Sequence, residues 1–586
     1  MKDRVDHAPT DRRPWNWYNS VVTAQIQVQQ SLTDTVEFPQ FCTTANEFWE
    51  RNRLPGGERV ILVEAMSQDI RVTLRNLTVA NVLRRFIPAQ LVVFTGADDD
   101  WNEILWTFFD SEVLSAISRA YGAVDVIDIH DLVDSRIADR EPGDLHVAGK
   151  DLPVTGSGIE PAVLEEIVRA TLSRVLKVPR VTDEIRAGAK YAEVRQRSEQ
   201  FSNIYDALFA GLDPVALVTS HVDYNHWGLA VETATRFNVP TVHVQSTGTL
   251  KAYALFPEKR RGAATFRAEL THQIGEFFEQ YVWSNRDRLR SSAELSAWRV
   301  KGDWGRPAWW RGGAMAAIEL QTPEDRLSLR EHALARFGFD PDKPVVAVFN
   351  HAISDAPRTN VEIFDDLAAW YEATADYATK RADVNWLFLD HPNQNLYDST
   401  GFFDSLKERL AGSRLVFLPS LELSKNVMWS LVDLGVTVRG SISNELPAFG
   451  IPAIQAGWSE WSNCGFTIVA DDAGDYWKRL DESIDSILAG RPLITEEQIE
   501  RARLWAWFYR SGADVPTQLV QPWEMGRTQP LLRAVRVSMR HVEADADPAF
   551  TAVRRMWVRK EPFLTRIDMT LPPQEFALAL GGVSEL

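Results

Sequence analysis

The chain has 586 residues, more than one hydrophobic core usually holds, so two or more domains are expected. Its composition, 45% hydrophobic and 25% charged, is that of a soluble globular protein, and the two distant cysteines, Cys42 and Cys464, argue against a disulfide framework or a Cys-based zinc site. The net charge of −18 argues against a general nucleic-acid binder, because neutralising phosphates requires clustered Lys and Arg.

The first half of the chain alternates strands with helices. After an N-terminal helical extension (1–57), strands are predicted at 59–65, 90–96, 124–131, 215–220 and 239–245. Residues 246–256 are predicted to form a further turn and helix. Alternation of this kind indicates βαβ units and a parallel sheet, so we assign residues 58–330 to a first Rossmann-like domain with a helical insertion.

The second half restarts the same pattern after a linker expected at 299–313. Strands are predicted at 343–351, 384–392, 413–420, 436–438 (within the stretch 428–440) and 451–457, and helices at 360–382, 473–490 and 495–510. We assign residues 331–522 to a second Rossmann-like domain and residues 523–586 to a C-terminal helical tail. The predicted fold class is α/β, with two parallel sheets flanked by helices and a cleft between the domains.

The N-terminal segment predicts no export. The first twenty residues lack the apolar core of a signal peptide, and no apolar run approaches the ~18 residues of a membrane-spanning helix. We expect a cytoplasmic protein, which leaves open peripheral contact with the inner face of a membrane.

A turn of small residues stands out in VRGSISNELPAFGIPAIQAG (438–457), where a strand is predicted to end and a helix to begin. A helix N-terminus offers unpaired N–H groups and a partial positive charge to a phosphate, and small residues allow its close approach. The alternative is structural: Ser443 caps the helix and Glu445 favours its first turn.

This stretch resembles the donor-binding region of GT-B glycosyltransferases that build bacterial capsules and surface polysaccharides. VFNHAISDAP (348–357) and VNWLFLDHPN (384–393) resemble other parts of the second domain of that family, and SHVDYNHWGLAVETATRFNVPTVHVQ (220–245) resembles the last βα unit of its first domain. The resemblance is best over residues 340–480. It implies two Rossmann-like domains facing a cleft, a nucleotide-sugar substrate and no bound metal.

The resemblance implies which residues hold the donor: Gly440, Ser441, Ser443 and Glu445 at the turn, with His391 of the His-Pro pair. The sequence departs from the family at one point, because Leu389 and Asp390 stand where a basic residue is common. Either another cation serves, Arg439 or Lys425, or the donor differs, or activity is lost. For His391 the structural alternative is a buried imidazole held by backbone groups.

The stretch SHVDYNHWG (220–228) follows a predicted strand and carries the candidate general base, Asp223 or His221, since inverting transfer needs a base near the acceptor hydroxyl. Tyr224 and His226 beside it, with Ser246 and Thr247 in the following turn, are the expected acceptor contacts. The alternatives are an Asx turn at Asp223, with Tyr224 and His226 packing on the next helix, and a capped helix after residue 247.

The acidic run GADDDW (96–101) invites a metal reading, but acids between a strand and a helix more often serve as a cap and first-turn charges, so no metal is expected. The leading hypothesis is an inverting glycosyltransferase. It would move a hexose or a Kdo- or sialic-acid-type sugar from a nucleotide-sugar donor to a surface polysaccharide or glycolipid, without a further cofactor. Two alternatives stay open: a polyol-phosphate transferase of the teichoic-acid type, and an inactive GT-B scaffold that binds a glycan or a partner enzyme. A sugar-nucleotide 2-epimerase shares the architecture too, but is usually shorter.

Overall fold

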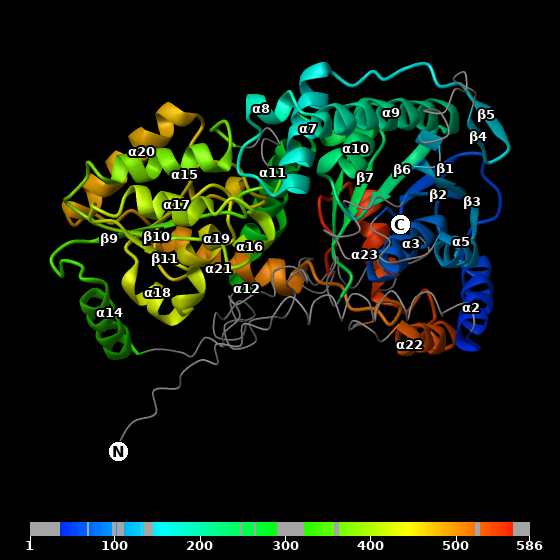
Figure 1. Ribbon diagram of the computed structural model, residues 1–586. Coiled ribbons are helices and arrows are strands. Elements are labelled where there is room, and N and C mark those ends of the chain that lie inside the picture. The colour runs from blue at the N-terminus through cyan, green and yellow to red at the C-terminus, as the bar shows by residue number, and fades with distance from the viewer. Residues whose placement is uncertain are drawn as a thin grey trace.

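We analysed a computed structural model, which describes residues 35–66, 70–96, 101, 111–130, 132–133, 145–245, 249–262, 265–289, 322–356, 362–521 and 528–566. The described residues form two lobes, each built on a six-stranded sheet (Figure 1). The linker expected at 299–313 lies outside these ranges. Among the helices of the described ranges, none is long and apolar enough to cross a membrane.

The first lobe contains a mixed sheet with the strand order β3-β2-β1-β6-β7-β8. All neighbours pair in parallel except β7 and β8, which are antiparallel. The strands are β1 (Val60–Glu64), β2 (Gln90–Thr95), β3 (Ala123–Asp128), β6 (Pro214–Thr219), β7 (Thr241–Val244) and β8 (Ala252–Leu255). These positions confirm the five strands predicted for this half.

The helix predicted over 246–256 is wrong, because Ala252–Leu255 form the edge strand β8. All four residues are buried. A short run that is buried on every side has no periodicity by which to separate a strand from a helix. The third predicted strand is also shorter than expected, since β3 ends at Asp128 rather than at residue 131.

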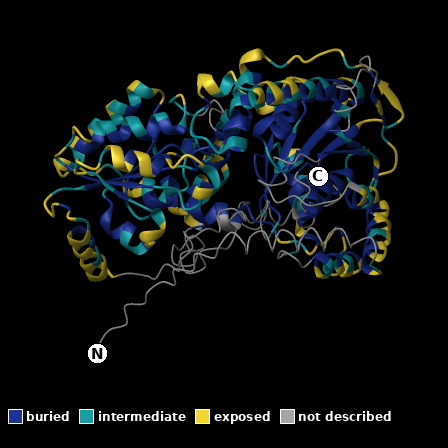
Figure 2. Ribbon diagram, viewed as in Figure 1, coloured by how far each residue is buried: buried dark blue, intermediate teal, exposed yellow. Residues whose placement is uncertain are grey.

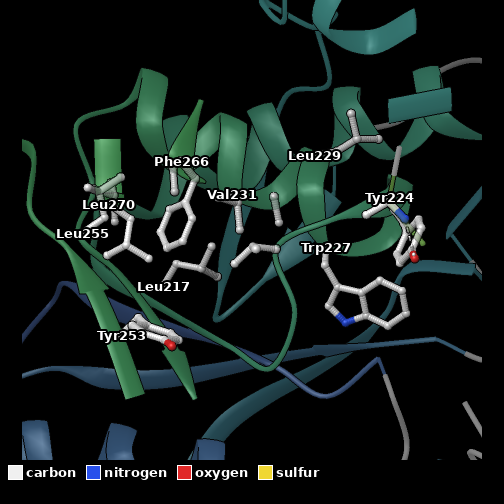
Figure 3. Packing of buried hydrophobic residues seen from close by; sticks show 14 of the residues in the cluster. Leu217, Tyr224, Trp227, Leu229, Val231, Tyr253, Leu255, Phe266 and Leu270 are labelled. Atoms are coloured by element: carbon white, nitrogen blue, oxygen red, sulfur yellow. Dashed lines mark hydrogen bonds between the residues drawn. The ribbon is translucent and has the colours of Figure 1, made fainter. Parts of the chain in front are cut away.

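Side chains of the first sheet alternate between two hydrophobic cores. Val60 and Leu62 of β1 face one core and Ile61 and Val63 face the other, as the two-residue period of a strand requires. The first core lies under α7 (Pro161–Leu176), α9 (Ala189–Leu212), α10 (Leu229–Arg236) and α11 (Phe266–Phe277). The second lies under α2 (Glu37–Arg51), α3 (Ile70–Arg84) and α5 (Ser111–Ala120). Figure 3 shows Val231 of α10 and Phe266 and Leu270 of α11 above the strand residues Leu217 and Leu255.

The second lobe contains a fully parallel sheet with the order β11-β10-β9-β12-β13-β14. Its strands are β9 (Val345–Phe349), β10 (Asn385–Leu389), β11 (Val416–Leu418), β12 (Leu434–Thr437), β13 (Ala453–Gln455) and β14 (Ile468–Val469). The main helices are α14 (Pro323–Phe337), α15 (Leu367–Ala378), α16 (Gln394–Tyr397), α17 (Phe402–Arg409), α18 (Lys425–Leu431), α19 (Ile442–Ala448), α20 (Ala473–Leu488) and α21 (Glu496–Trp507). The predicted strands and the helices α20 and α21 are confirmed, and α15 is shorter than the predicted 360–382.

Local sequence signals set several helix starts. Thr322 caps α14 in a capping box with Asp325, and the side chains of Asp366 and Asp472 cap α15 and α20. Such caps satisfy backbone N–H groups that have no partner within the helix. Figure 2 shows the buried residues gathered on the two sheets and on the helix faces that cover them, while α14, α2 and α22 carry much of the exposed surface.

The end of the chain returns to the first lobe. Helix α22 (Thr528–His541) packs against α2, and α23 (Pro548–Arg559) packs against α3 (Figure 1). Buried residues of both helices, Leu532 and Val553 among them, belong to the same core as β1 and β2. The residues described at 528–566 therefore complete the first lobe.

Candidate functional site

The polar residues singled out in the sequence gather where the two lobes meet. They follow the carboxyl ends of β6 in the first lobe and of β9, β10 and β12 in the second. Ligands of open parallel sheets bind beyond these ends. An open hollow of about 570 Å³ lies between α11 and Asn463 of the second lobe, and neither the His391 stretch nor the small-residue turn lines it.

Asp223, a predicted base, is held in a buried ion pair. The carboxylate is 5% exposed, and Arg267 of α11 donates from Nε to Oδ1 at 2.9 Å and from Nη2 to Oδ2. Burial raises the pKa of Asp223, but the charge of Arg267 and its hydrogen bonds outweigh this and hold the pKa well below its ordinary value. A carboxylate held at both oxygens has little affinity for a proton, so Asp223 as general base, which stays a prediction, would require the pair with Arg267 to open.

His221, the other predicted base, is arranged as a hydrogen-bond donor. The backbone N–H groups of Val222 and Asp223 point at its Nδ1, at 3.1 Å and 3.2 Å. With Nδ1 accepting, the neutral ring carries its proton on Nε2. Burial lowers the pKa of His221, which keeps the ring neutral. The ring can therefore donate to a ligand from Nε2, but it has no free lone pair there to receive a proton.

Tyr224 connects the two lobes. Its hydroxyl donates to Asp355 Oδ1 at 2.8 Å and accepts from the backbone N–H of Ala356 at 3.1 Å. Both Tyr224 (φ 66°) and Ala356 (φ 43°) adopt left-handed backbone conformations that cost non-glycine residues about 1–3 kcal/mol each. The contact of Tyr224 with an acceptor, as predicted, would require this link to open.

His226 points into the core of the first lobe. The residue is 2% exposed, its Nε2 lies 2.9 Å from Nε2 of His130, and its Nδ1 lies 2.7 Å from Oδ1 of Asn225. All residues of the π-helical turn Tyr224–Gly228 are buried. The ring of His226 packs among protein side chains, so His226 as an acceptor contact stays a prediction that would require this packing to open.

Arg439, proposed as a substitute cation, binds protein groups. It follows β12 and donates from Nη2 to the carbonyl oxygens of Asp355 at 2.8 Å and Ala356 at 3.1 Å, and its Nε lies 3.3 Å from Oε1 of Glu362. The side chain is 8% exposed. Arg439 thus ties the loop after β9 to the end of β12, and its charge is balanced by Glu362.

The small-residue turn leads into the short helix α19, as predicted. A side chain at Gly440 would place its Cβ 2.9 Å from Oγ1 of Thr437, so the turn needs glycine there. Ser441 occupies the N-cap position, and its hydroxyl makes no capping hydrogen bond. Gly440 and Ser441 remain predicted donor contacts.

Ser443 is committed to the interior of the second lobe. It is fully buried, donates to the carbonyl of Gly440 at 2.8 Å, and accepts from Gln455 Nε2 at 3.0 Å and Trp461 Nε1 at 3.2 Å. A direct hydrogen bond from Ser443 to a donor phosphate stays a prediction, and it would require these three hydrogen bonds to rearrange. Ser443 is not the N-cap either, since Ser441 takes that position.

Glu445 and Lys425 form a second buried ion pair. Lys425 Nζ donates to Glu445 Oε2, and the two residues are 8% and 2% exposed, respectively. The carboxylate of Glu445 is thus bound by an ammonium group rather than presented to a ribose. The roles of Glu445 as a donor contact and of Lys425 as a phosphate cation stay predictions that would require this ion pair to open.

Two histidines stand side by side at the ends of β9 and β10. The rings of His351 and His391 lie 6.1 Å apart. His391 Nδ1 accepts from the backbone N–H of Asn393 at 3.2 Å, which leaves its proton on Nε2. His351 Nε2 lies 3.9 Å from Oδ2 of Asp355. Burial lowers the pKa of His351 to about 3 and that of His391 to about 4, so both rings are neutral near pH 7.

Sequence reasoning missed two buried amides beside these histidines. Asn350 (6% exposed) accepts the backbone N–H of His351 through Oδ1 at 2.9 Å, but its Nδ2 has no partner among the described residues. Gln394 (8% exposed) has no described partner for either amide atom. The signal that could have found them is position, since Asn350 directly follows β9 and Gln394 begins α16 shortly after β10, two strands that end at the junction.

Some expectations fall on undescribed residues. Ser246, Thr247 and the acidic run at 98–100 lie outside the described ranges. Within the part of the chain that is described, no group of three or more His, Cys, Asp or Glu is placed to hold a metal ion.

No family model and no curated protein matches the sequence. Similar solved structures include a UDP-GlcNAc 2-epimerase from Neisseria meningitidis bound to UDP-GlcNAc (11% identity over 78% of this chain and 99% of that chain, TM-score 0.22). They also include Anabaena HepE in complex with UDP-glucose (9%, 77% and 95%, TM-score 0.26) and a glycosyltransferase from Rickettsia africae (9%, 83% and 99%, TM-score 0.26). The assignment of two Rossmann-like lobes rests on the strand orders and parallel pairing of the chain itself.

Proposed function

We propose that this chain is an inverting glycosyltransferase that moves a sugar from a nucleotide-sugar donor to a surface polysaccharide or glycolipid acceptor, without a catalytic metal. The observation that carries the proposal is the junction itself, where the carboxyl ends of β6, β9, β10 and β12 bring neutral histidines and a carboxylate together. The resemblance of the motifs in residues 340–480 to those of GT-B enzymes supports a nucleotide sugar as the substrate.

The general base in this proposal is His351. Asp223 is held by Arg267, and His221 offers a proton rather than a lone pair. His351 Nε2 faces Asp355 Oδ2, which would keep the ring proton on Nε2, and the described residues give Nδ1 no hydrogen-bond partner. A carboxylate that orients an imidazole in this way favours proton uptake at the other nitrogen.

The transfer would form one bond at the anomeric carbon and break another. The acceptor hydroxyl gives its proton to His351 Nδ1 while its oxygen forms a bond to the anomeric carbon, and the bond from that carbon to the donor phosphate oxygen breaks. The leaving nucleotide would accept hydrogen bonds from His391 Nε2–H and from the turn at Gly440 and Ser441. Its negative charge would also raise the pKa of His351 toward the working pH.

An inactive scaffold is the second candidate, because the charged side chains at or near the junction neutralise one another in three ion pairs. Arg267 binds Asp223, Arg439 faces Glu362 and Lys425 binds Glu445. Such a site needs no ligand to balance its charges. This candidate predicts no affinity for nucleotides.

A thermal-shift screen of the purified protein against CMP, CDP, UDP, GDP and dTDP separates the two. A ligand at about 100 times its dissociation constant stabilises by about 2.7 kcal/mol, which raises the melting temperature by a few degrees. A selective shift supports a donor site and identifies the nucleotide. No shift with any of them leaves the scaffold as the better account.

The assignment of the base is tested with His351→Asn in a nucleotide-release assay on the responding donor. Transfer should fall about 100-fold or more, as expected for loss of a general base, with nucleotide affinity unchanged. His146→Asn, on an exposed hairpin of the first lobe, is the matched control. Full activity of His351→Asn would place the base elsewhere.

A further inference from the structure

We infer that Asn350, His351, His391 and Gln394 form a subsite for the hydroxyl groups of an uncharged sugar, next to the carboxylate of Asp355. The inference rests on the proposed function and adds the class of sugar to it.

The two unpartnered amides are the first support. Buried polar groups in native proteins are almost always hydrogen-bonded, so a buried amide without a partner calls for a ligand or an ordered water. Gln394 lacks a described partner on both amide atoms, and Asn350 lacks one on Nδ2. An amide offers donors and an acceptor together, which is the pattern that sugar hydroxyls can satisfy.

The contacts of the four residues place them together. Gln394 donates its backbone N–H to the carbonyl of His391 at 2.9 Å, His351 donates its own to Oδ1 of Asn350, and the two imidazole rings lie 6.1 Å apart. The strands that carry them are neighbours, with Phe349 paired to Leu389. The proton of His391 on Nε2 adds a further neutral donor.

Charge argues for a sugar without a carboxylate. Asp355 is about one-third exposed and near both histidines, so a second carboxylate would be repelled. The arginines of this region are engaged: Arg174 donates to the carbonyl of Leu396 at 2.9 Å and stacks on Tyr397, and Arg439 binds two carbonyls and Glu362. An ionised Asp355 is instead a good acceptor for sugar hydroxyls.

The spacing suits a donor whose phosphates sit at the Gly440–Ser441 turn. Strand β12 lies next to β9, and β9 lies next to β10. Neighbouring strands are about 4.8 Å apart, so the ends of β9 and β10 lie roughly 5 and 10 Å from the end of β12. A sugar attached to a nucleotide by a diphosphate would reach that far.

The experiment compares each nucleotide with its sugar conjugate by titration calorimetry: UDP with UDP-glucose, GDP with GDP-mannose, and dTDP with dTDP-glucose. For the responding pair, the conjugate should bind wild-type protein about tenfold or more tightly than the nucleotide alone. Asn350→Ala/Gln394→Ala should abolish that gain and leave affinity for the nucleotide alone within about twofold. Gln40→Ala, an exposed glutamine of α2, is the control and should change neither affinity.

The acidic conjugate tests the charge class. UDP-glucuronic acid or GDP-mannuronic acid should bind no more tightly than the matching nucleotide. A gain from the neutral sugar that persists in the double variant, or an equal gain from the acidic sugar, would overturn the inference.

Failure of the proposed function would look different, since no nucleotide would bind at all. Free glucose and mannose are then examined by saturation-transfer NMR on wild-type protein and the double variant. A signal that the double variant loses would keep the subsite as a glycan site of a scaffold. Equal signals, or none, would refute it.

Discussion

Replacing Arg267 with methionine should destabilise the first lobe by about 3–5 kcal/mol, because it leaves the carboxylate of Asp223 buried without its partner. Asp223 is 5% exposed and takes hydrogen bonds at both oxygens from this one guanidinium. The side chain of Arg267 is 28% exposed, and Oε1 of a second carboxylate, Glu460, lies 3.9 Å from its Nη1. Methionine keeps much of the length of the side chain, so the loss of stability measures mainly the removal of the positive charge.

The pH dependence of stability provides a second test of the ion pair between Asp223 and Arg267. In the wild-type protein the pKa of Asp223 is depressed, so its contribution is present above pH ~4 and is lost as pH falls below that value. Without Arg267, burial, the largest single influence on the carboxyl, is opposed only by the charges of His221 and Arg439, so we expect the pKa of Asp223 to rise above the unfolded value. The variant would then gain relative stability as pH falls, and its deficit against wild type should shrink from pH 7 to pH 5.

Thermal unfolding at pH 7 and pH 5 measures both effects. At about 2 °C per kcal/mol for a large domain, the expected loss is about 6–10 °C at pH 7. Asp223→Asn/Arg267→Met removes both charges and should recover at least half of the loss. A loss below about 2 °C at pH 7, or one that is equal at both pH values, would refute the pairing as a source of stability.

Three further variants and one chelation experiment probe other parts of the molecule. Lys425→Met should lower stability by about 3–5 kcal/mol, because it removes the ammonium group from the buried carboxylate of Glu445. A change in nucleotide affinity without loss of melting temperature would instead support Glu445 as a donor contact. His391, with its pKa lowered to about 4, binds a proton less readily in the folded state than in the unfolded state. Its contribution to the free energy of unfolding is therefore present above pH ~6.5 and lost as pH falls from there toward 4. His391→Gln should make the melting temperature fall less steeply across this window, and an unchanged slope would contradict the assignment. Gly275→Ala would place a Cβ 2.6 Å from that of Asn463, so it should cost about 1–3 kcal/mol and loosen the contact of α11 with the second lobe, seen as a larger radius of gyration by solution scattering; an unchanged radius and melting temperature would mean that the contact adapts. EDTA should leave nucleotide release intact, and a strict need for a divalent ion would reopen a metal role for the acidic run at 98–100.

The two sheets were predictable because their strands have a strong local pattern. The apolar runs before Glu64, Thr95, Asn350 and Asp390 end abruptly in polar residues, and the alternation with helices leaves few topologies other than parallel sheets. The rule that ligands bind beyond the carboxyl ends of parallel strands predicts that His221 and His391 lie at one junction. The edge strand β8 was not predicted, because a fully buried run has no hydrophobic periodicity that distinguishes a strand from a helix.

The partners of the site residues could not be predicted. Arg267 lies 44 residues from Asp223, and Asp355 lies 131 residues from Tyr224, so nothing in the local pattern connects them. The burial of His226 could not be predicted for a different reason, since it lies in a π-helical turn that buries every residue of the segment. Side-chain roles at this junction depend on long-range pairing, which sequence spacing does not encode.

The return of α22 and α23 to the first lobe has a consequence for how the chain is made. Residues of the first lobe emerge from the ribosome early, yet the face of the sheet that carries α2 and α3 stays incomplete until residues 528–566 have been synthesised. At about 5–20 residues per second, the several hundred residues in between take tens of seconds to make. During that interval an apolar surface is open, so the nascent protein should depend on chaperones, and truncation before residue 528 should yield insoluble protein rather than an isolated lobe.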